Sequence, residues 1–571
     1  AWGGTTRLPR LVGLQAALDL LLTGKQMSAR RAQRIGFAGD ILPAETFRNE
    51  VSDHALALME APARSSIPRR GLAKRLLEDT APGRRVILAR ARKKVRSTTG
   101  GHYPAPMRIL EVLRDNLGRS VARSLDAEAR AGSELVVSPV CKNLIHVFRL
   151  REASRKSTGV EAAGVAVRPV TALGVVGAGV MGGGIAQLAA HRGVRVRMKD
   201  IRHEAVTGGL QHARSLFDRA VQRHRMSPRE ADHRMELISG GLDFAGFSAL
   251  DIVVEAVAEK LDVKRAVLDE VERKVADTCI LATNTSSLSV DAMAQDLEDP
   301  TRFCGMHFFN PVHRMPLVEV VRGRRTSDAC LATVYRFAVA LGKVPVVVRD
   351  GPGFLVNRIL GPYLNEAGWL LGEGARIQSI DRAARAFGMP MGPLRLIDEV
   401  GIDVSTHAGA SMHQALGDRF APAPALVALG EGGRLGRKGG KGFYVYEKGR
   451  EKRVDEEVYV ELELPAPRQR QGPDGDQIRQ RLLVRMVNEA ARILEDGIVD
   501  NAGAVDLAMI MGTGFPPFRG GLLRFADSLH TRRLLHHARD FEERHGSRFA
   551  PAPLLEDLAR RDQGFYDAFG G

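Results

Sequence analysis

The middle of the chain carries short apolar runs that predict a sheet covered by helices. A run from residue 171 ends in a glycine at 177, and residues 194–199 alternate apolar and polar positions as a strand does. Further strand candidates lie at 251–255, 279–282, 303–309, 317–321 and 344–348. Because these strands alternate with helix-length segments, we predict an α/β doubly wound sheet domain over residues 169–350.

The sequence on both sides of this domain predicts helices. Apolar spacing predicts short helices at 15–22 and 29–35, and the helical pattern returns at 107–156 after a Pro-rich, basic stretch. Beyond residue 350 the strand pattern stops. The run Arg358-Ile-Leu-Gly-Pro-Tyr-Leu-Asn-Glu366-Ala is then echoed by Arg481-Leu-Leu-Val-Arg-Met-Val-Asn-Glu489-Ala. The repeat predicts two related all-α C-terminal domains, 351–450 and 470–571, with a charged, Pro-rich linker near 447–476.

The segment Gly177-Ala-Gly179-Val-Met181-Gly182 has the spacing of a dinucleotide-binding turn between a strand and a helix. Gly177 allows the turn, Gly179 lets a pyrophosphate approach the backbone, and Gly182 lets the helix pack closely. Asp200 ends the next strand candidate, where a carboxylate accepts hydrogen bonds from ribose hydroxyls and repels a 2′-phosphate. These residues predict a Rossmann-type fold that binds NAD. Residues 170–190 carry no charge, but their glycines and Gln187 favour this turn over a membrane span.

Composition narrows the classes of partner. The chain has 571 residues, enough for several domains, and a formal net charge of +16. Arginine is densest at 64–96, where no aromatic residue or nucleic-acid-binding motif accompanies it. We interpret this run as a solvated helical linker; a phosphate-rich substrate or an acidic partner is the alternative, and nucleic-acid binding is disfavoured. The four cysteines lack metal-site spacing, so we predict no bound metal. No secretory signal or transmembrane segment is evident, so the predicted location is the cytoplasm.

Candidate catalytic residues lie at predicted strand ends. His307, within His307-Phe-Phe-Asn310-Pro, is followed by Glu319 on the next strand candidate. Imidazole has a pKa suited to removing an alcohol proton, and a carboxylate on its far nitrogen would fix the tautomer. Ser286 and Asn357 are candidate donors to the reacting oxygen, with a simple turn and a helix cap as their respective alternatives. In the second repeat Gln480 replaces Asn357, so only the first copy is equipped for chemistry.

Together these motifs resemble the L-3-hydroxyacyl-CoA dehydrogenase family, in the duplicated form found in α-subunits of bacterial fatty acid β-oxidation complexes. The resemblance rests on residues 177–182, 254–259, 284–288, 307–311, 319, 351–358 and 441–444. It implies that His307 and Glu319 form the catalytic pair and that Ser286, Asn310 and Asn357 bind substrate. It also implies that Glu259 and Lys264 line the NAD site with Asp200. The implied substrate is an acyl-CoA, and a thiolase β-subunit is a possible partner.

Residues 1–62 resemble the tail of a crotonase (enoyl-CoA hydratase/isomerase) domain, and 63–168, including Gly101-His-Tyr-Pro-Ala-Pro106, its linker and helices. The chain opens on Ala1, and the family's hydratase glutamates and oxyanion-hole amides belong to segments before it. We therefore expect a truncated remnant without hydratase activity, whose helices lack their sheet partners. The leading interpretation is an NAD-dependent 3-hydroxyacyl-CoA dehydrogenase. The alternatives are a non-catalytic acyl-CoA-binding scaffold for a thiolase partner and another hydroxy-acid dehydrogenase with the same sheet.

Overall fold

A computed structural model describes residues 2–60, 72–162 and 164–570 and divides the chain into two compact units, Ala1–Leu144 and Ile145–Gly571. The predicted boundary between residues 62 and 63, and the start of the basic run at 64–71, lie outside the described residues.

The first unit is helical in its described residues. Its helices are α1 (Gly4–Val12), α2 (Leu14–Thr23), α3 (Ala29–Arg34), α4 (Phe47–Glu60), α5 (Leu72–Asp79), α6 (Ala81–Thr99), α7 (Pro104–Asn116) and α8 (Val121–Val136), with α9 (Pro139–Lys156) continuing into the second unit. The predicted helices at 15–22 and 29–35 are confirmed as α2 and α3. A small core joins α2, α6 and α7 through Leu18, Leu88, Val95 and Leu113. Most basic residues of α6 are exposed to solvent, and the interpretation of this run as a linker stays a prediction.

The second unit contains an eight-stranded sheet in the order β3-β2-β1-β4-β5-β6-β7-β8. The strands are β1 (Ala172–Val176), β2 (Arg195–Lys199), β3 (Ile238–Gly241), β4 (Ile252–Glu255), β5 (Ile280–Thr283), β6 (Phe303–Phe308), β7 (Leu317–Arg322) and β8 (Val344–Arg349). All neighbours pair in parallel except β6 and β7, which are antiparallel. The predicted doubly wound domain is confirmed, but β3 escaped prediction because its sequence, Ile-Ser-Gly-Gly, has one apolar residue.

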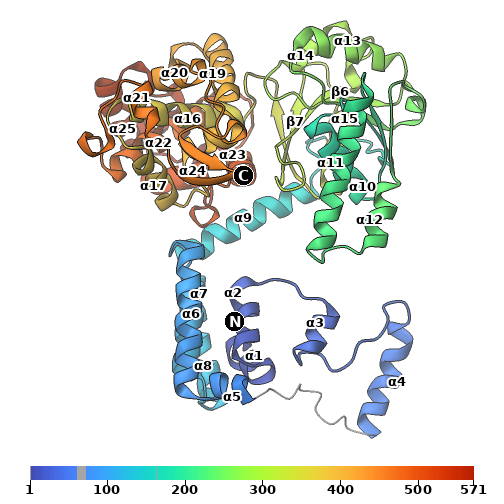
Figure 1. The fold of residues 1–571 in the computed structure, drawn as a ribbon, viewed down its shortest axis with the longest axis vertical. Helices are drawn as coiled ribbons and strands as arrows, with labels where there is room; N and C mark the ends of the chain where they lie inside the picture. Colours follow the sequence, from blue (N-terminus) through green and yellow to red (C-terminus); the bar gives the residue numbers. More distant parts are fainter. Residues whose placement is uncertain (1, 61–71, 163, 571) are drawn as a thin grey trace. The chain divides into compact units, whose positions relative to one another are not determined.

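Helices flank this sheet (Figure 1). Apolar side chains pack on both of its faces. The helices are α10 (Val180–His191), α11 (His203–Gln222), α12 (Pro228–Met235), α13 (Leu261–Glu272), α14 (Val290–Met293) and α15 (Asp328–Ala340). Along β1, Ala172 and Val176 join one core while Leu173 and Val175 join the other, the alternation expected of a strand. The chain order reverses on either side of β1, and ligands bind at such a switch point in open α/β sheets.

The rest of the second unit is mainly helical. Its helices are α16 (Val356–Gly372), α17 (Ile377–Phe387), α18 (Pro393–Val400), α19 (Ile402–Leu416), α20 (Pro424–Glu431), α21 (Glu457–Glu461), α22 (Gly475–Glu495), α23 (Ala502–Thr513), α24 (Leu522–Leu529), α25 (Thr531–His545), α26 (Pro553–Arg561) and α27 (Phe565–Phe569). The long helices α16 and α22, which carry the repeated motif, pack against each other (Figure 1).

The expectation that strands stop beyond residue 350 is wrong. An antiparallel hairpin forms from β9 (Tyr444–Glu447) and β10 (Arg450–Val454), and it extends into the predicted linker. The sequence of β10 is Arg-Glu-Lys-Arg-Val, almost entirely charged and exposed, so no apolar pattern marks it. None of the described helices is long and apolar enough to cross a membrane.

The internal repeat reappears in the hydrogen bonding. Asp381 accepts hydrogen bonds from the backbone of α18 and from the hydroxyl of Tyr444, at 2.6 Å. Asp506 does the same toward α24 and the hydroxyl of Tyr566, at 2.7 Å. Each buried carboxylate therefore fixes the N-terminus of the following helix, where a negative charge is favourable.

Candidate active site

The glycine turn follows β1 and opens α10. Gly177 has φ 101°, a conformation that glycine adopts readily, and a Cβ on Gly182 would lie 1.8 Å from the carbonyl oxygen of Gly177. Apart from its chain neighbours, no atom of the described residues lies within 4 Å of the Cβ position of Gly179. The turn therefore leaves open space at a helix N-terminus, which fits the diphosphate of a dinucleotide. Met181 lies in the first turn of α10 and is half-buried.

Asp200 follows β2 directly and joins this turn. Its Oδ2 accepts a hydrogen bond from the backbone N–H of Ala178, at 2.8 Å, and its Oδ1 accepts one from Ile201 at 2.7 Å. The carboxylate predicted to face the ribose thus also holds the glycine turn in place.

His307 and Glu319 face each other on adjacent antiparallel strands. They are direct partners in the register of β6 and β7, and His307 Nδ1 lies 2.7 Å from Glu319 Oε2. Both are buried, with 4% and 0% of their surface exposed. When Nδ1 donates to the carboxylate, Nε2 keeps the lone pair of the neutral ring. The pair therefore has the arrangement of a base with an orienting carboxylate.

The second oxygen of Glu319 is held by the start of α16. Its Oε1 accepts hydrogen bonds from the backbone N–H of Val356, at 2.9 Å, and of Leu355, at 3.3 Å. These two backbone donors at the N-terminus of α16 fix the position and the orientation of the Glu319 carboxylate. No sequence signal marks this contact, because a backbone donor can come from any residue except proline.

Further side chains fix the surroundings of His307. The Phe309 and Phe354 rings lie with centroids 4.4 and 5.9 Å from the imidazole. Asn284 Oδ1 accepts a hydrogen bond from the N–H of Phe308, at 2.9 Å, and so ties the loop after β5 to β6. Sequence reasoning assigned no role to Asn284. A side-chain amide at a strand end next to the histidine strand was the available signal.

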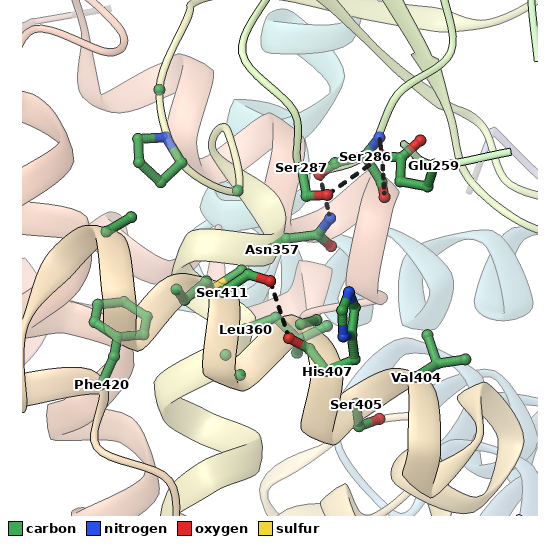
Figure 2. Close-up of a pocket in the computed structure, with 18 of the residues that line it drawn as sticks. Glu259, Ser286, Ser287, Asn357, Leu360, Val404, Ser405, His407, Ser411 and Phe420 are labelled. Atoms are coloured by element: carbon green, nitrogen blue, oxygen red, sulfur yellow. Dashed lines mark hydrogen bonds between the residues drawn. The ribbon is translucent and has the colours of Figure 1, made fainter. Parts of the chain in front are cut away.

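Ser286, Glu259 and Asn357 come together after β5. Glu259 Oε1 accepts hydrogen bonds from Thr285 Oγ1 at 2.6 Å and from the N–H and hydroxyl of Ser286 at 2.8 and 3.3 Å. Asn357 Nδ2 donates to the carbonyl oxygen of Ser286 at 3.3 Å. Figure 2 shows Asn357 pointing toward Ser286 and Ser287. The structure thus joins the glycine-turn domain to the first helical repeat at the predicted substrate residues.

Lys264 is buried between two carboxylates. Its Nζ lies 2.8 Å from Glu255 Oε1 and 3.3 Å from Glu259 Oε2. Burial acts to raise the pKa of Glu259, but the Lys264 charge and the Thr285 and Ser286 hydrogen bonds outweigh it and lower that pKa. Glu259 therefore stays ionised at neutral pH. The pairing of Lys264 with Glu255 was not predicted.

A cavity of about 1170 Å³ opens beside this group. Glu259, Ser286 and Asn357 line one part of it, and α19 contributes residues 403–409, 411, 412 and 415. Val404, Ser405, His407 and Ser411 of α19 are labelled in Figure 2. Leu360, Leu364, Phe420 and Leu426 supply apolar lining. The charged lining comprises Arg322, Arg324 and Arg349 together with Asp291 and Asp350, and Arg324 pairs with Asp291.

The structure does not bring Asn310 to this cavity. Among the described residues, its lining includes neither Asn310 nor His307. Asn310 is exposed at a cis Asn310–Pro311 bond and lines a second cavity, of about 210 Å³, with Val180 and Gly184 of α10. A role for Asn310 in substrate binding stays a prediction.

Comparison with known proteins assigns this architecture to a family. Residues 172–351 match "3-hydroxyacyl-CoA dehydrogenase, NAD binding domain", and residues 353–446 and 478–565 match "3-hydroxyacyl-CoA dehydrogenase, C-terminal domain". The second of these families therefore matches both helical repeats.

Relatives and solved structures agree. The fatty acid oxidation complex subunit alpha of Shewanella loihica is 40% identical over 99% of this chain and 79% of the relative, and that of Shewanella sp. ANA-3 is 39% identical with the same coverage. The crystal structure of 3-hydroxybutyryl-CoA dehydrogenase from Escherichia coli K12 has a TM-score of 0.61 and 28% identity, covering 69% of this chain and 99% of that one. The chain belongs to the 3-hydroxyacyl-CoA dehydrogenase family and is an NAD-dependent dehydrogenase, related over almost its whole length to fatty acid oxidation complex α-subunits.

Proposed function

We propose that this chain oxidises L-3-hydroxyacyl-CoA to 3-oxoacyl-CoA in fatty acid β-oxidation, with His307 as the general base and Glu319 as its partner. The observation that carries the proposal is the 2.7 Å contact between His307 Nδ1 and Glu319 Oε2. A buried pair of this kind lets a neutral imidazole accept a proton and stabilises the imidazolium that forms.

The reaction needs two groups to leave the substrate. His307 Nε2 takes the proton of the 3-hydroxyl, and the hydride on the same carbon leaves as the C=O bond forms. NAD, when bound, supplies the acceptor for that hydride. Gly177, Gly179 and Gly182 would hold its diphosphate and Asp200 its ribose, while Glu259 and Lys264 follow β4, the strand beside β1. The developing positive charge on His307 would be balanced by Glu319, which the backbone donors at the N-terminus of α16 hold in place.

Ser286 and Asn357 would position the reacting oxygen. They lie together where the sheet meets α16. The Asn357 amide, and the Ser286 hydroxyl once it turns from Glu259, would be neutral donors to the partial negative charge on that oxygen. Their placement at the edge of the large cavity supports this role.

The cavity also fits the substrate class. An acyl-CoA has an apolar tail and anionic phosphates, and the cavity offers apolar lining from Leu360, Leu364 and Phe420 and charged lining that includes Arg322 and Arg324. We assign the acyl chain to the apolar part and the phosphates to the arginines.

The relatives are named as subunits of a fatty acid oxidation complex, and by this relation we infer that the chain works in a multienzyme assembly with a thiolase partner. The lack of hydratase activity stays a prediction, tested by adding enoyl-CoA to the protein and following its hydration. A scaffold that binds acyl-CoA without chemistry is the alternative, and it predicts no NADH formation at all.

The test is NADH formation from NAD and 3-hydroxyacyl-CoA. His307→Gln should lower kcat by about 10²-fold or more and leave the affinity for NAD near that of the wild type. His233→Gln is the matched control, because His233 is exposed on α12 in the same domain. Equal turnover of His307→Gln and the wild type would remove His307 from the chemistry. A wild type that binds acyl-CoA but forms no NADH would favour the scaffold.

A further inference from the structure

Two buried arginine–glutamate pairs cross between α16 and α22, and the internal repeat makes them equivalent. Arg358 Nε donates to Glu489 Oε1 at 2.7 Å, and Arg481 Nε donates to Glu366 Oε1 at 2.8 Å. Arg358 and Arg481 occupy the same place in the repeated motif, as do Glu366 and Glu489. Each of the four residues has no more than 4% of its surface exposed. The same ion pair is thus built twice, once in each direction.

The surroundings of the two pairs differ. Arg358 lies in the first turn of α16, directly after Asn357, and two residues from the Val356 N–H that binds Glu319. Arg481 lies further inside α22, after Gln480, and α22 begins at Gly475 with its own capping box on Asp474. Only the Arg358 pair is therefore attached to the turn that reaches the active site.

Two partners from α22 and its C-terminal end hold the Arg358 guanidinium. Besides the Glu489 bond, Arg358 makes an ion pair with Asp496, and the second oxygen of Glu489 accepts from Arg419 Nε at 3.3 Å. A guanidinium is planar and presents its donors in a fixed fork, so two carboxylates fix both its position and its orientation. Because the Arg358 side chain is buried, water cannot replace a carboxylate partner that is lost.

We propose that Glu489, in the second repeat, is a positioning residue for the dehydrogenase site in the first repeat. By holding Arg358, it fixes the first turn of α16, and with it the Asn357 amide and the backbone donors to Glu319. The second repeat would then support catalysis in the first repeat, although it carries Gln480 at the position equivalent to Asn357. The inference rests on the proposed roles of His307, Glu319 and Asn357.

The experiment compares the two equivalent pairs in the full chain. Glu489→Gln removes the carboxylate charge that holds Arg358 in the first turn of α16. Glu366→Gln removes the equivalent charge from the pair with Arg481. Glu366 also binds Arg548 at 3.1 Å, so its variant should lose at least as much stability. We expect Glu489→Gln to lower kcat by about 10- to 100-fold, because small displacements of catalytic groups have effects of that size. The affinity for NAD should stay near that of the wild type, and Glu366→Gln should keep kcat within about twofold.

The pH profile separates positioning from loss of stability. If the first turn of α16 moves, Glu319 loses backbone donors and its carboxylate binds the imidazolium more strongly. The acidic limb of kcat/KM should then move to higher pH in Glu489→Gln and stay in place in Glu366→Gln. A thermal melt of both variants measures the structural cost.

A milder variant keeps the test decisive if Glu489→Gln does not fold. Asp496 is 49% exposed, so Asp496→Asn should fold, and we expect it to lower kcat by up to about fivefold. Equal kcat losses in the variants of the two pairs, or no change in Glu489→Gln and Asp496→Asn, would overturn the proposal. If His307→Gln is inactive while these variants behave like Glu366→Gln, only this inference fails and the proposed function stands.

Discussion

Replacing Glu319 by glutamine tests the catalytic pair most directly. Glutamine keeps the shape of the side chain and removes its charge, at a residue with no exposed surface. One carboxylate oxygen faces His307 Nδ1 and the other faces the N–H groups of Val356 and Leu355. All three neighbours donate, so in either orientation the NH₂ of a glutamine meets a donor on one side.

The magnitude follows from the geometry. Imidazolium and carboxylate charges centred about 4 Å apart attract by about 4 kcal/mol at an effective dielectric constant of about 20. The neutral amide loses most of that attraction in the transition state, which corresponds to a kcat lower by about 10³-fold. The donor left unpaired in the core should also lower the free energy of unfolding by about 1–3 kcal/mol.

The assay is NADH absorbance with 3-hydroxyacyl-CoA, together with NAD affinity by fluorescence titration and stability by urea denaturation. Glu272→Gln is the control, because both oxygens of Glu272 accept backbone N–H bonds, from Glu298 and Asp299, away from the site. It should lose similar stability and keep its turnover. If folded Glu319→Gln turns over within about tenfold of the wild type, the carboxylate does not stabilise the imidazolium and the reasoning fails.

Three further predictions concern the cofactor, the substrate and stability. Asp200→Ala removes the acceptor for the Ala178 N–H and a negative charge, so NAD should bind about tenfold more weakly and discrimination against NADP should fall. Titration with both cofactors measures this, and an unchanged preference for NAD would contradict the assignment of Asp200. Ala415→Phe fills the cavity from α19, so the KM for long-chain substrates should rise about tenfold and that for 3-hydroxybutyryl-CoA should hardly change; a uniform change would argue against an acyl site there. Burial raises the pKa of Asp506 from 3.8 to about 7, so the native state binds this proton more tightly than the unfolded chain does. The stability that this proton adds is complete below about pH 4 and is lost as the pH rises through about 7. The wild type should therefore lose stability relative to Asp506→Asn across that window in urea titrations, whereas a difference independent of pH would refute the shift.

The sequence alone determined the elements and the chemistry available to them. Apolar runs and their spacing located every strand of the large sheet except β3, because burial on both faces demands continuous apolar residues. The glycine turn could be predicted because its backbone requires glycine at given positions. The repeat could be predicted because the same motif occurs twice in the sequence. Strand β10 could not be predicted from the sequence, because it is exposed and carries almost no apolar residues.

The tertiary structure alone decided which groups meet. The antiparallel register of β6 and β7 puts His307 opposite Glu319, and the end of a distant helix, α16, supplies the donors to Glu319. The fold also placed Asn310 in a cavity beside α10 that Ser286 does not line, and joined Arg358 to Glu489 across the two repeats. Local patterns report only whether a residue is buried and which backbone it prefers. Contacts between residues far apart in the chain depend on strand register and helix packing, which are set by the whole core at once.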